Sequence, residues 1–281
     1  MTQRKGGWEL PISEHELTRL TRDLDQAHQA YLPVMNTSAA DLVEQIREQQ
    51  HGGPAPFVPA ASRRRVLLGV GGAVAAFALA ACSSASSSKS AVAAGASSGA
   101  GAGSTAASAS SSSMYTGDLQ LVALATALEN QAVGAYAAAL AAAKAGRLGT
   151  VPPAVATFAT TVMAQHADHA KAWNAVLIGA GKPAITNVPL SNQPLVLKAL
   201  GAVTDVAGVA GLALQLEDQG AQTYLFATYN VTSPGGIATA ASIAPVEAMH
   251  SAILNFVLGQ YPVPDDFLPV DKAASPSLLT V

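Results

Sequence analysis

Glutamate and histidine are scarce in the later part of this 281-residue sequence, and those that occur there are regularly spaced. After residue 82 the chain contains only three glutamates and three histidines. Solvated helix faces usually carry many glutamates, so glutamates confined to apolar stretches serve another purpose. Carboxylate and imidazole groups together suit iron, manganese or zinc. The six candidate metal ligands are Glu129, His166, His169, Glu217, Glu247 and His250.

These residues belong to an internal repeat. The first two glutamates are each followed, seven positions later, by a tyrosine, Tyr136 in one case and Tyr224 in the other. In two other segments a histidine follows another ligand-type residue by three positions. Residues three or seven apart share one face of a helix, so each segment presents its polar groups on one side.

The elements that must position these groups are long stretches rich in alanine and leucine. Glycine and proline punctuation predicts four helices, at about 116–145, 152–179, 194–230 and 237–259, with a kink or a restart at Pro245. Two hairpins joined by one longer link are typical of a bundle with a single crossover. Because the hairpins repeat each other, an approximate two-fold axis would bring equivalent side chains together at the centre.

Over about 115–260 the pattern resembles the ferritin-like, di-iron carboxylate families, in which two helices supply a glutamate and two supply Glu-x-x-His. The resemblance implies an all-α fold, a ferritin-like up-down four-helix bundle built from two repeated helical hairpins with one crossover connection. It also implies a metal site in the bundle interior. The residues that match the family ligands are Glu129, Glu217, Glu247, His250 and His169.

His166 departs from the family pattern, because it stands where those proteins carry a further glutamate. Three carboxylates do not neutralise two divalent ions, and imidazole cannot bridge two ions through one atom. The sequence therefore leaves open whether the site binds one metal ion or two. Asp168 is not expected to substitute, since its neighbour His169 lies about 100° away around the helix. The resemblance implies Fe or Mn, and Zn is also compatible with such ligands.

Other polar residues flank the predicted ligands. Tyr136 and Tyr224 resemble the tyrosines that line such centres, and two interpretations stay open for them. They either donate hydrogen bonds to the opposite carboxylates and orient them, or they simply fill the core. The orienting role is equally open to Asn130, Gln131, Asp218 and Gln219.

The segment 62–82 resembles a twin-arginine export signal that ends in a lipoprotein box. Arg63 and Arg64 precede an apolar run, and small residues precede Cys82, the only cysteine. The run is shorter than the roughly 20 residues that span a bilayer, which disfavours a plain transmembrane anchor. The resemblance implies use of the twin-arginine export machinery and a lipid on Cys82. The protein would then be extracytoplasmic and lipid-anchored to the cytoplasmic membrane of a bacterium.

Composition predicts five parts along the chain. A charged segment, 1–61, is either a cytoplasmic pre-region or lies ahead of the true start. The signal, 62–82, precedes a Ser/Ala/Gly-rich tether at 83–113, the bundle at 114–262 and a tail at 263–281. A net charge of -3 does not indicate a surface that binds nucleic acid. No nucleophilic triad or phosphate loop is evident, so a hydrolase has little support.

Two functions follow from these patterns. The first is a redox or metal-handling protein, with a metal-dependent oxidoreductase as the possible enzyme class. The alternative is a non-enzymatic scaffold or stress-related lipoprotein with a degenerate metal site, since exported desiccation-related ferritin-like domains resemble this chain in signal and pattern. Replacing Glu217 and Glu247 with glutamine should abolish the first function and preserve the second.

Overall fold

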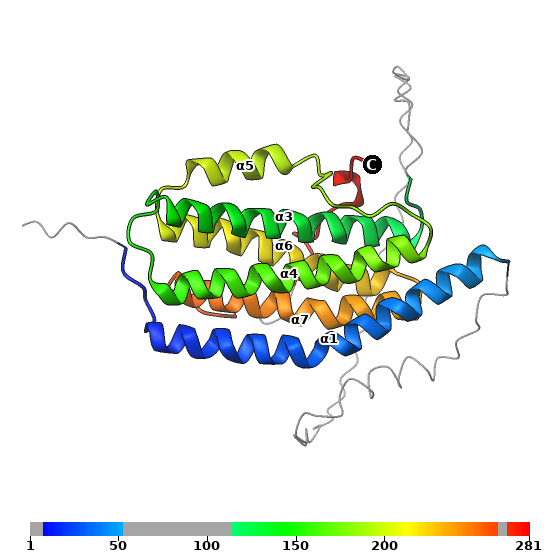
Figure 1. Cartoon of the computed structure of the whole chain (residues 1–281), viewed down its shortest axis with the longest axis horizontal. Coiled ribbons are helices and arrows are strands. Elements are labelled where there is room, and N and C mark those ends of the chain that lie inside the picture. Colours follow the sequence, from blue (N-terminus) through cyan, green and yellow to red (C-terminus); the bar gives the residue numbers. More distant parts are fainter. Residues whose placement is uncertain (1–7, 53–113, 264–268) are drawn as a thin grey trace, which may run out of the picture. The chain divides into compact units, whose positions relative to one another are not determined.

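The computed structural model describes residues 8–52, 114–263 and 269–281, and in these ranges the chain forms helices and no strand (Figure 1). This confirms the predicted all-α class. Arg63, Arg64, Cys82 and the predicted tether lie outside the described residues. The helices are α1 (Glu14–Gln50), α3 (Asp118–Lys144), α4 (Pro153–Gly179), α5 (Gln193–Ala202), α6 (Val206–Asn230) and α7 (Pro234–Val257), followed by a short 3-10 helix, η1 (Pro276–Leu278).

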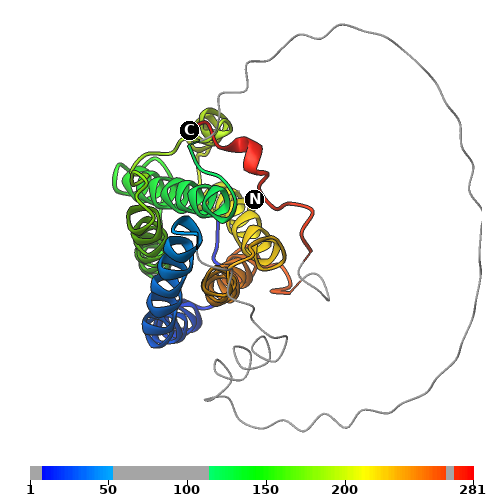
Figure 2. The same ribbon diagram turned by 90° about the vertical axis from the view of Figure 1, so that its right-hand side faces the viewer.

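Two helical hairpins make up the bundle. Helix α3 packs against α4, α6 packs against α7, and α3 also contacts α6 (Figure 2). Alanine is the strongest helix former, so these sequences favour helix throughout. Gly146 and Gly181, with φ of 72° and 74°, follow the ends of α3 and α4. Glycine adopts this left-handed conformation without strain, which is why the helices stop there.

The third predicted helix, 194–230, is in fact two helices. Helix α5 ends at Ala202, and α6 starts at Val206. Asp205 is extended and its Oδ1 accepts a hydrogen bond from the backbone N–H of Gly208 at 2.7 Å. This cap satisfies a free amide at the start of a helix, so a new helix begins there. Helix α5 lies outside the bundle beside α3 and contains no buried residue (Figure 1).

The fourth predicted helix is one continuous element. Helix α7 passes through Pro245 without a restart. Pro245 and Ala241 are both exposed, so the Ala241 carbonyl, which lacks its helical donor, faces solvent. Within the described part of the chain, α7 alone is long and apolar enough to cross a membrane by length and composition, and half of its most apolar window is buried.

Helix α1 lies in the segment that the sequence assigns to a pre-region, and it packs against both α4 and α7 (Figure 2). Two glycines permit this close approach. A Cβ added at Gly235 of α7 would lie 2.5 Å from the backbone nitrogen of Leu42, and one at Gly179 of α4 would lie 2.6 Å from Val43 Cγ1. Most of the buried positions of α1 are three, four or seven residues apart and so lie on one face of the helix: Leu17, Thr21, Leu24, His28, Met35, Ser38, Ala39, Leu42 and Ile46.

The contribution of α1 can be measured with Leu42→Ala in the full chain. Leu42 is fully buried, so we expect the substitution to lower the free energy of unfolding by about 2–5 kcal/mol in urea denaturation. Leu195→Ala is the matched control, because Leu195 on α5 is 69% exposed, and it should change stability by less than about 0.5 kcal/mol. Equal stability of the two variants would mean that α1 is not part of the folded unit.

Candidate metal centre

The predicted ligands converge in the middle of the bundle. Helices α3 and α6 supply one glutamate each, while α4 and α7 supply pairs of residues three positions apart. Residues with this spacing share a helix face, which here is the face turned to the bundle axis. None of the six is more than 3% exposed: Glu129, His166, His169, Glu217, Glu247 and His250.

The six side chains form two overlapping groups of four. In each group, one nitrogen or oxygen atom from every residue lies within 4.8 Å of the corresponding atoms of the others. Metals bind these ligands at about 2.0–2.2 Å, so small side-chain adjustments suffice for one ion to reach each set. His166 and Glu247 belong to both groups. The first group adds Glu129 and His169, and the second adds Glu217 and His250.

His166 occupies the space between the two single glutamates. Its Nδ1 lies 2.7 Å from Glu129 Oε2, and its Nε2 lies 3.1 Å from Glu217 Oε1. The Nδ1 atom is also 3.6 Å from Glu247 Oε1. One imidazole therefore contacts all three carboxylates through its two nitrogens, in the place where the family pattern has a carboxylate.

The charges of the centre depend strongly on one another. Burial lowers the pKa of His166, but Glu247, Glu217 and Glu129 outweigh burial and raise the pKa well above its usual range. Burial opposes the charged form of His169 too, yet Glu129 and Glu247 raise the pKa of His169 to about 9. Burial raises the pKa of Glu129, whereas His169 and His166 lower it to about 2. Without a metal ion, protons on His166 and His169 therefore offset carboxylate charge in the centre.

The arrangement leaves room and free ligand atoms for a cation. Both ring nitrogens of His169 and the Oε1 atom of Glu247 are buried and have no hydrogen-bond partner among the described residues. His169 Nδ1 is 3.0 Å from Glu247 Oε1, but the two atoms do not meet in hydrogen-bond geometry. A cavity of about 20 Å³ lies at the centre, and Glu129, His166, Glu247 and Tyr224 are among the residues that line it. Unpaired buried polar atoms each cost about 1–3 kcal/mol, and a bound cation would remove that cost.

Gly220 leaves space beside one of these carboxylates. A Cβ added at Gly220 would lie 3.0 Å from Glu247 Oε2, closer than ordinary van der Waals contact. Gly220 lies three residues after Glu217, so the two face the same side of α6. The absence of a side chain at this position therefore lets the Glu247 carboxylate reach the centre.

The two tyrosines make reciprocal contacts across the bundle. Tyr136 of α3 donates its hydroxyl hydrogen to Glu217 Oε1 of α6 at 2.5 Å. Tyr224 of α6 donates to Glu129 Oε1 of α3. Burial and the nearby carboxylates raise the pKa of both phenols well above their usual range, so both stay protonated donors. Each tyrosine thus fixes the glutamate of the other hairpin.

Gln165 is a further positioning residue, and the sequence analysis did not identify it. Its Oε1 accepts a hydrogen bond from His250 Nε2 at 2.8 Å, while its Nε2 donates to Asp25 Oδ1 of α1 at 3.4 Å. This fixes the proton of His250 on Nε2 and directs Nδ1 to Glu217 Oε2, 3.0 Å away. The only signal for Gln165 in the sequence is its place next to His166 in an apolar helix.

Helix α1 also covers the His169 side of the centre. The buried ring of His28 lies 5.2 Å from that of His169, and its Nε2 is 3.4 Å from Asp168 Oδ2. Asp168 faces α1 and belongs to neither group of ligands, as its place on the helix predicts. Spacing gives no signal for His28, because it lies outside the repeated hairpins.

Three of the four polar neighbours of the glutamates bind other partners through their side chains, while the contact shown for Gln219 is through its backbone. Asn130 Nδ2 donates to the Ile185 carbonyl at 2.8 Å, and Gln131 Nε2 donates to Gln193 Oε1 at 2.7 Å. These bonds hold the crossover connection on α3. Asp218 pairs with Lys272 Nζ at 2.9 Å, and the backbone carbonyl of Gln219 accepts from Thr223.

The pH dependence of metal-free protein follows from these pKa shifts. The pKa of His169 rises from 6.5 to about 9 on folding, so its stabilisation is complete below pH 6.5 and is lost as pH rises through 9. The pKa of Glu129 falls from 4.5 to about 2, so its stabilisation is lost as pH falls through that range. We expect chelator-treated protein to be most stable to urea between pH 4.5 and 6.5.

The control for this prediction is His169→Gln, which removes the titrating imidazole. The loss of stability between pH 6.5 and 9 should be smaller in this variant than in the parent protein. An equal loss in both proteins would contradict the assignment. Metal affinity should rise over the same interval, because a bound ion must displace the protons.

Comparison with known proteins agrees with the geometry. A family model described as a ferritin-like domain matches residues 117–260, which contain all six ligand-type residues. This match confirms the resemblance drawn from the sequence. No curated protein and no solved structure matches the chain.

Proposed function

Because the chain belongs to the ferritin-like family, we propose that its bundle binds iron or manganese, as one or two ions, and that it acts in redox chemistry or metal handling. The observation that carries this proposal is the pair of overlapping ligand groups, buried and drawn from four helices. Such an ion, when bound, supplies Lewis acidity and can exchange electrons. Zinc fits the same atoms but would supply Lewis acidity alone.

The side chains of the centre would each have a definite task. Glu129, Glu217 and Glu247 supply the negative charge that attracts a cation into an apolar interior. The imidazoles of His169 and His250 supply neutral nitrogen ligands once they give up their protons. Tyr136 and Tyr224 hold the two single glutamates in place, and the apolar helices exclude bulk water, which strengthens the electrostatic attraction.

The number of ions depends on His166. As a neutral ligand, His166 could bind an ion in either group. As a protonated cation, it would instead supply the positive charge that a second ion would otherwise bring. Its contacts with Glu129 and Glu217 at 2.7 and 3.1 Å support the second role. We therefore favour one ion at the wild-type centre, with His166→Glu as the variant that restores the family pattern and takes up a second ion.

Metal analysis of protein purified without chelator tests the proposal. We expect close to one equivalent of metal in the parent protein, and much less in Glu217→Gln and Glu247→Gln. Removing a residue that only orients a ligand typically weakens binding about 10- to 100-fold, so loss of a ligand charge should weaken it at least as much. Glu48→Gln, the same change at an exposed position of α1, is the control and should retain the metal.

Less than about a tenth of an equivalent in the parent protein, with no uptake on titration with Fe(II) or Mn(II), would contradict metal binding. The alternative function, a scaffold with a degenerate site, would then be favoured. One observation supports that alternative: three imidazoles and three carboxylates can neutralise each other without any ion. A scaffold role would survive Glu217→Gln provided that the variant folds.

We further propose that the protein is exported by the twin-arginine route and anchored through a lipid on Cys82. The support is the pattern of Arg63, Arg64 and Cys82 in the sequence. Cleavage before Cys82 would cut the chain between α1 and the helices it covers. In the processed protein the faces of α4 and α7 around Gly179 and Gly235 would then lose their covalently linked neighbour.

Fractionation of cells that express Cys82→Ala tests the anchor. The parent protein should sediment with membranes and incorporate labelled fatty acid, whereas the variant should do neither. Cys82→Ala leaves the paired arginines intact, so export itself is unaffected and serves as the internal control. Equal membrane association of the two proteins would contradict a lipid anchor. The intact mass of the membrane form will show whether residues 1–81 have been removed.

A further inference from the structure

The two halves of the bundle differ beside their tyrosines. In one half, Trp173 Nε1 donates to Tyr224 Oη at 2.9 Å, and the two rings stack at 6.3 Å with an angle of 9°. The equivalent position in the other half is Leu254. Trp173 lies one turn after His169, and Leu254 lies one turn after His250 in the repeated hairpin. The repeat therefore places a large side chain beside one tyrosine and a smaller one beside the other.

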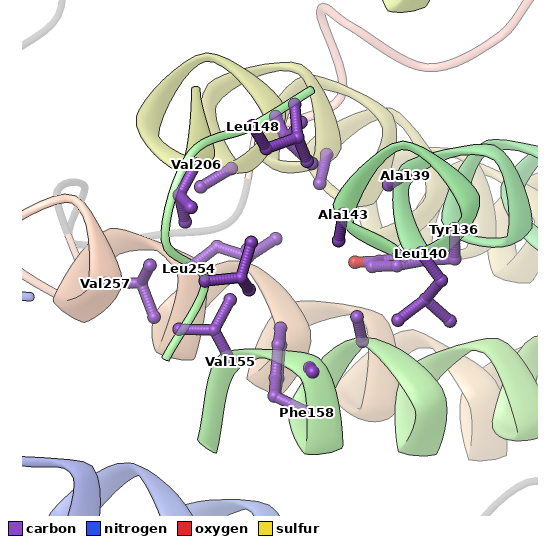
Figure 3. Close-up of a pocket in the computed structure, with 16 residues that line it drawn as sticks. Tyr136, Ala139, Leu140, Ala143, Leu148, Val155, Phe158, Val206, Leu254 and Val257 are labelled. Atoms are coloured by element: carbon purple, nitrogen blue, oxygen red, sulfur yellow. The ribbon is translucent and has the colours of Figure 1, made fainter. Parts of the chain in front are cut away.

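A cavity of about 50 Å³ lies where the tryptophan has no counterpart. It lies among the ends of α3, α4, α6 and α7 and is partly open to solvent, and Figure 3 shows side chains from these helices around it. Several alanines account for the space, because they reach less far into the bundle than leucine or phenylalanine would. Its walls include Tyr136, Phe158, Val206, Ala213, Leu254 and Val257.

The cavity suits a small apolar molecule better than water. Its lining is almost wholly hydrocarbon, and the hydroxyl of Tyr136 already donates its hydrogen to Glu217. A buried water molecule needs two to four polar partners, which this lining does not offer. Apolar cavities of about 150 Å³ stay dry and hold benzene or xenon. This cavity is about a third of that size, which suits a diatomic gas or a single xenon atom.

The cavity lies between Tyr136, which contacts the metal centre, and the end of the bundle. Ala213 lies one turn before Glu217, and Tyr136 links the cavity wall directly to that glutamate. The outer wall includes Val155 and Val209, which are only partly buried. A molecule bound in the cavity therefore lies beside Tyr136, whose hydroxyl contacts Glu217.

We propose that this cavity binds a small uncharged apolar molecule of the size of dioxygen and holds it beside the Tyr136–Glu217 pair. Binding requires only the apolar walls. A reaction of the bound molecule at the metal centre, in contrast, rests on the proposed function. On the opposite side of the centre Trp173 fills the equivalent space, so this apolar cavity has no counterpart beside Tyr224.

Xenon is the probe, applied to the metal-free full chain and followed by ¹²⁹Xe NMR and by crystals under xenon pressure. We expect xenon in the parent cavity and none in Leu254→Trp. This substitution places a tryptophan at the position equivalent to Trp173, where it should fill the cavity. Ala137→Leu is the matched control, because Ala137 is exposed and next to Tyr136, and it should keep xenon. Ordered water in the parent cavity, or xenon bound equally in Leu254→Trp, would overturn the proposal.

A second pair of variants guards against misfolding of Leu254→Trp. Ala213→Leu fills the cavity from α6 and should also remove xenon. Trp173→Leu makes the opposite half like this one, and it should create a second xenon position beside Tyr224. If Trp173→Leu gains no second position while the parent binds xenon, the difference between Trp173 and Leu254 is not what creates the cavity.

Oxygen consumption by iron-loaded protein distinguishes binding in the cavity from the proposed function of the metal centre. In iron-loaded protein, Leu254→Trp should keep its metal content but consume dioxygen more slowly than Ala137→Leu, most clearly at low oxygen. Xenon binding without metal binding would refute the proposed function and leave the cavity site intact. Metal binding without xenon binding would refute the cavity site alone.

Discussion

The structure depends on the burial of three carboxylates and three imidazoles in one place. An isolated carboxylate in an apolar interior costs several kcal/mol, so these groups must balance one another or share a cation. The contacts of His166 with Glu129 and Glu217 at 2.7 and 3.1 Å show how protons provide that balance. The unpaired nitrogens of His169 show that the balance is incomplete. The same six groups therefore satisfy one another only in part without metal, and they form a ligand set with it.

The two halves of the bundle are related by an approximate two-fold symmetry, and they differ from it at specific residues. The tyrosines obey the symmetry, since each donates to the opposite glutamate. Trp173 breaks it on one side, and a cavity remains beside Leu254 on the other. Helix α1 breaks it again, because it lies on α4 and α7 and places His28 against His169 (Figure 2). Dioxygen-sized molecules and metal ions would thus meet different surroundings on the two sides of the centre.

Much of the fold and of the centre could be predicted from local spacing. Glycine and proline mark the ends of α3 and α4, and three-residue spacing places His166 beside His169 on one face. Contacts that depend on distant segments could not be predicted in this way. Gln165 becomes a positioning residue only because α1 brings Asp25 to it. The break between α5 and α6 depends on the N-cap residue Asp205, and the apolar pattern continues across it, so the sequence is interpreted as one helix. The exchange of tryptophan for leucine is present in the sequence, because Trp173 and Leu254 occupy equivalent positions of the repeat.

The central claim is that these side chains surround a metal ion. Anomalous diffraction from crystals grown with Mn(II) or Fe(II), recorded on both sides of the metal absorption edge, tests it most directly. We expect one anomalous peak beside Glu247, with carboxylate oxygens and a ring nitrogen of His169 or His250 about 2.0–2.2 Å away. A peak confined to the protein surface, with the six side chains still hydrogen-bonded to one another at the centre, would contradict it.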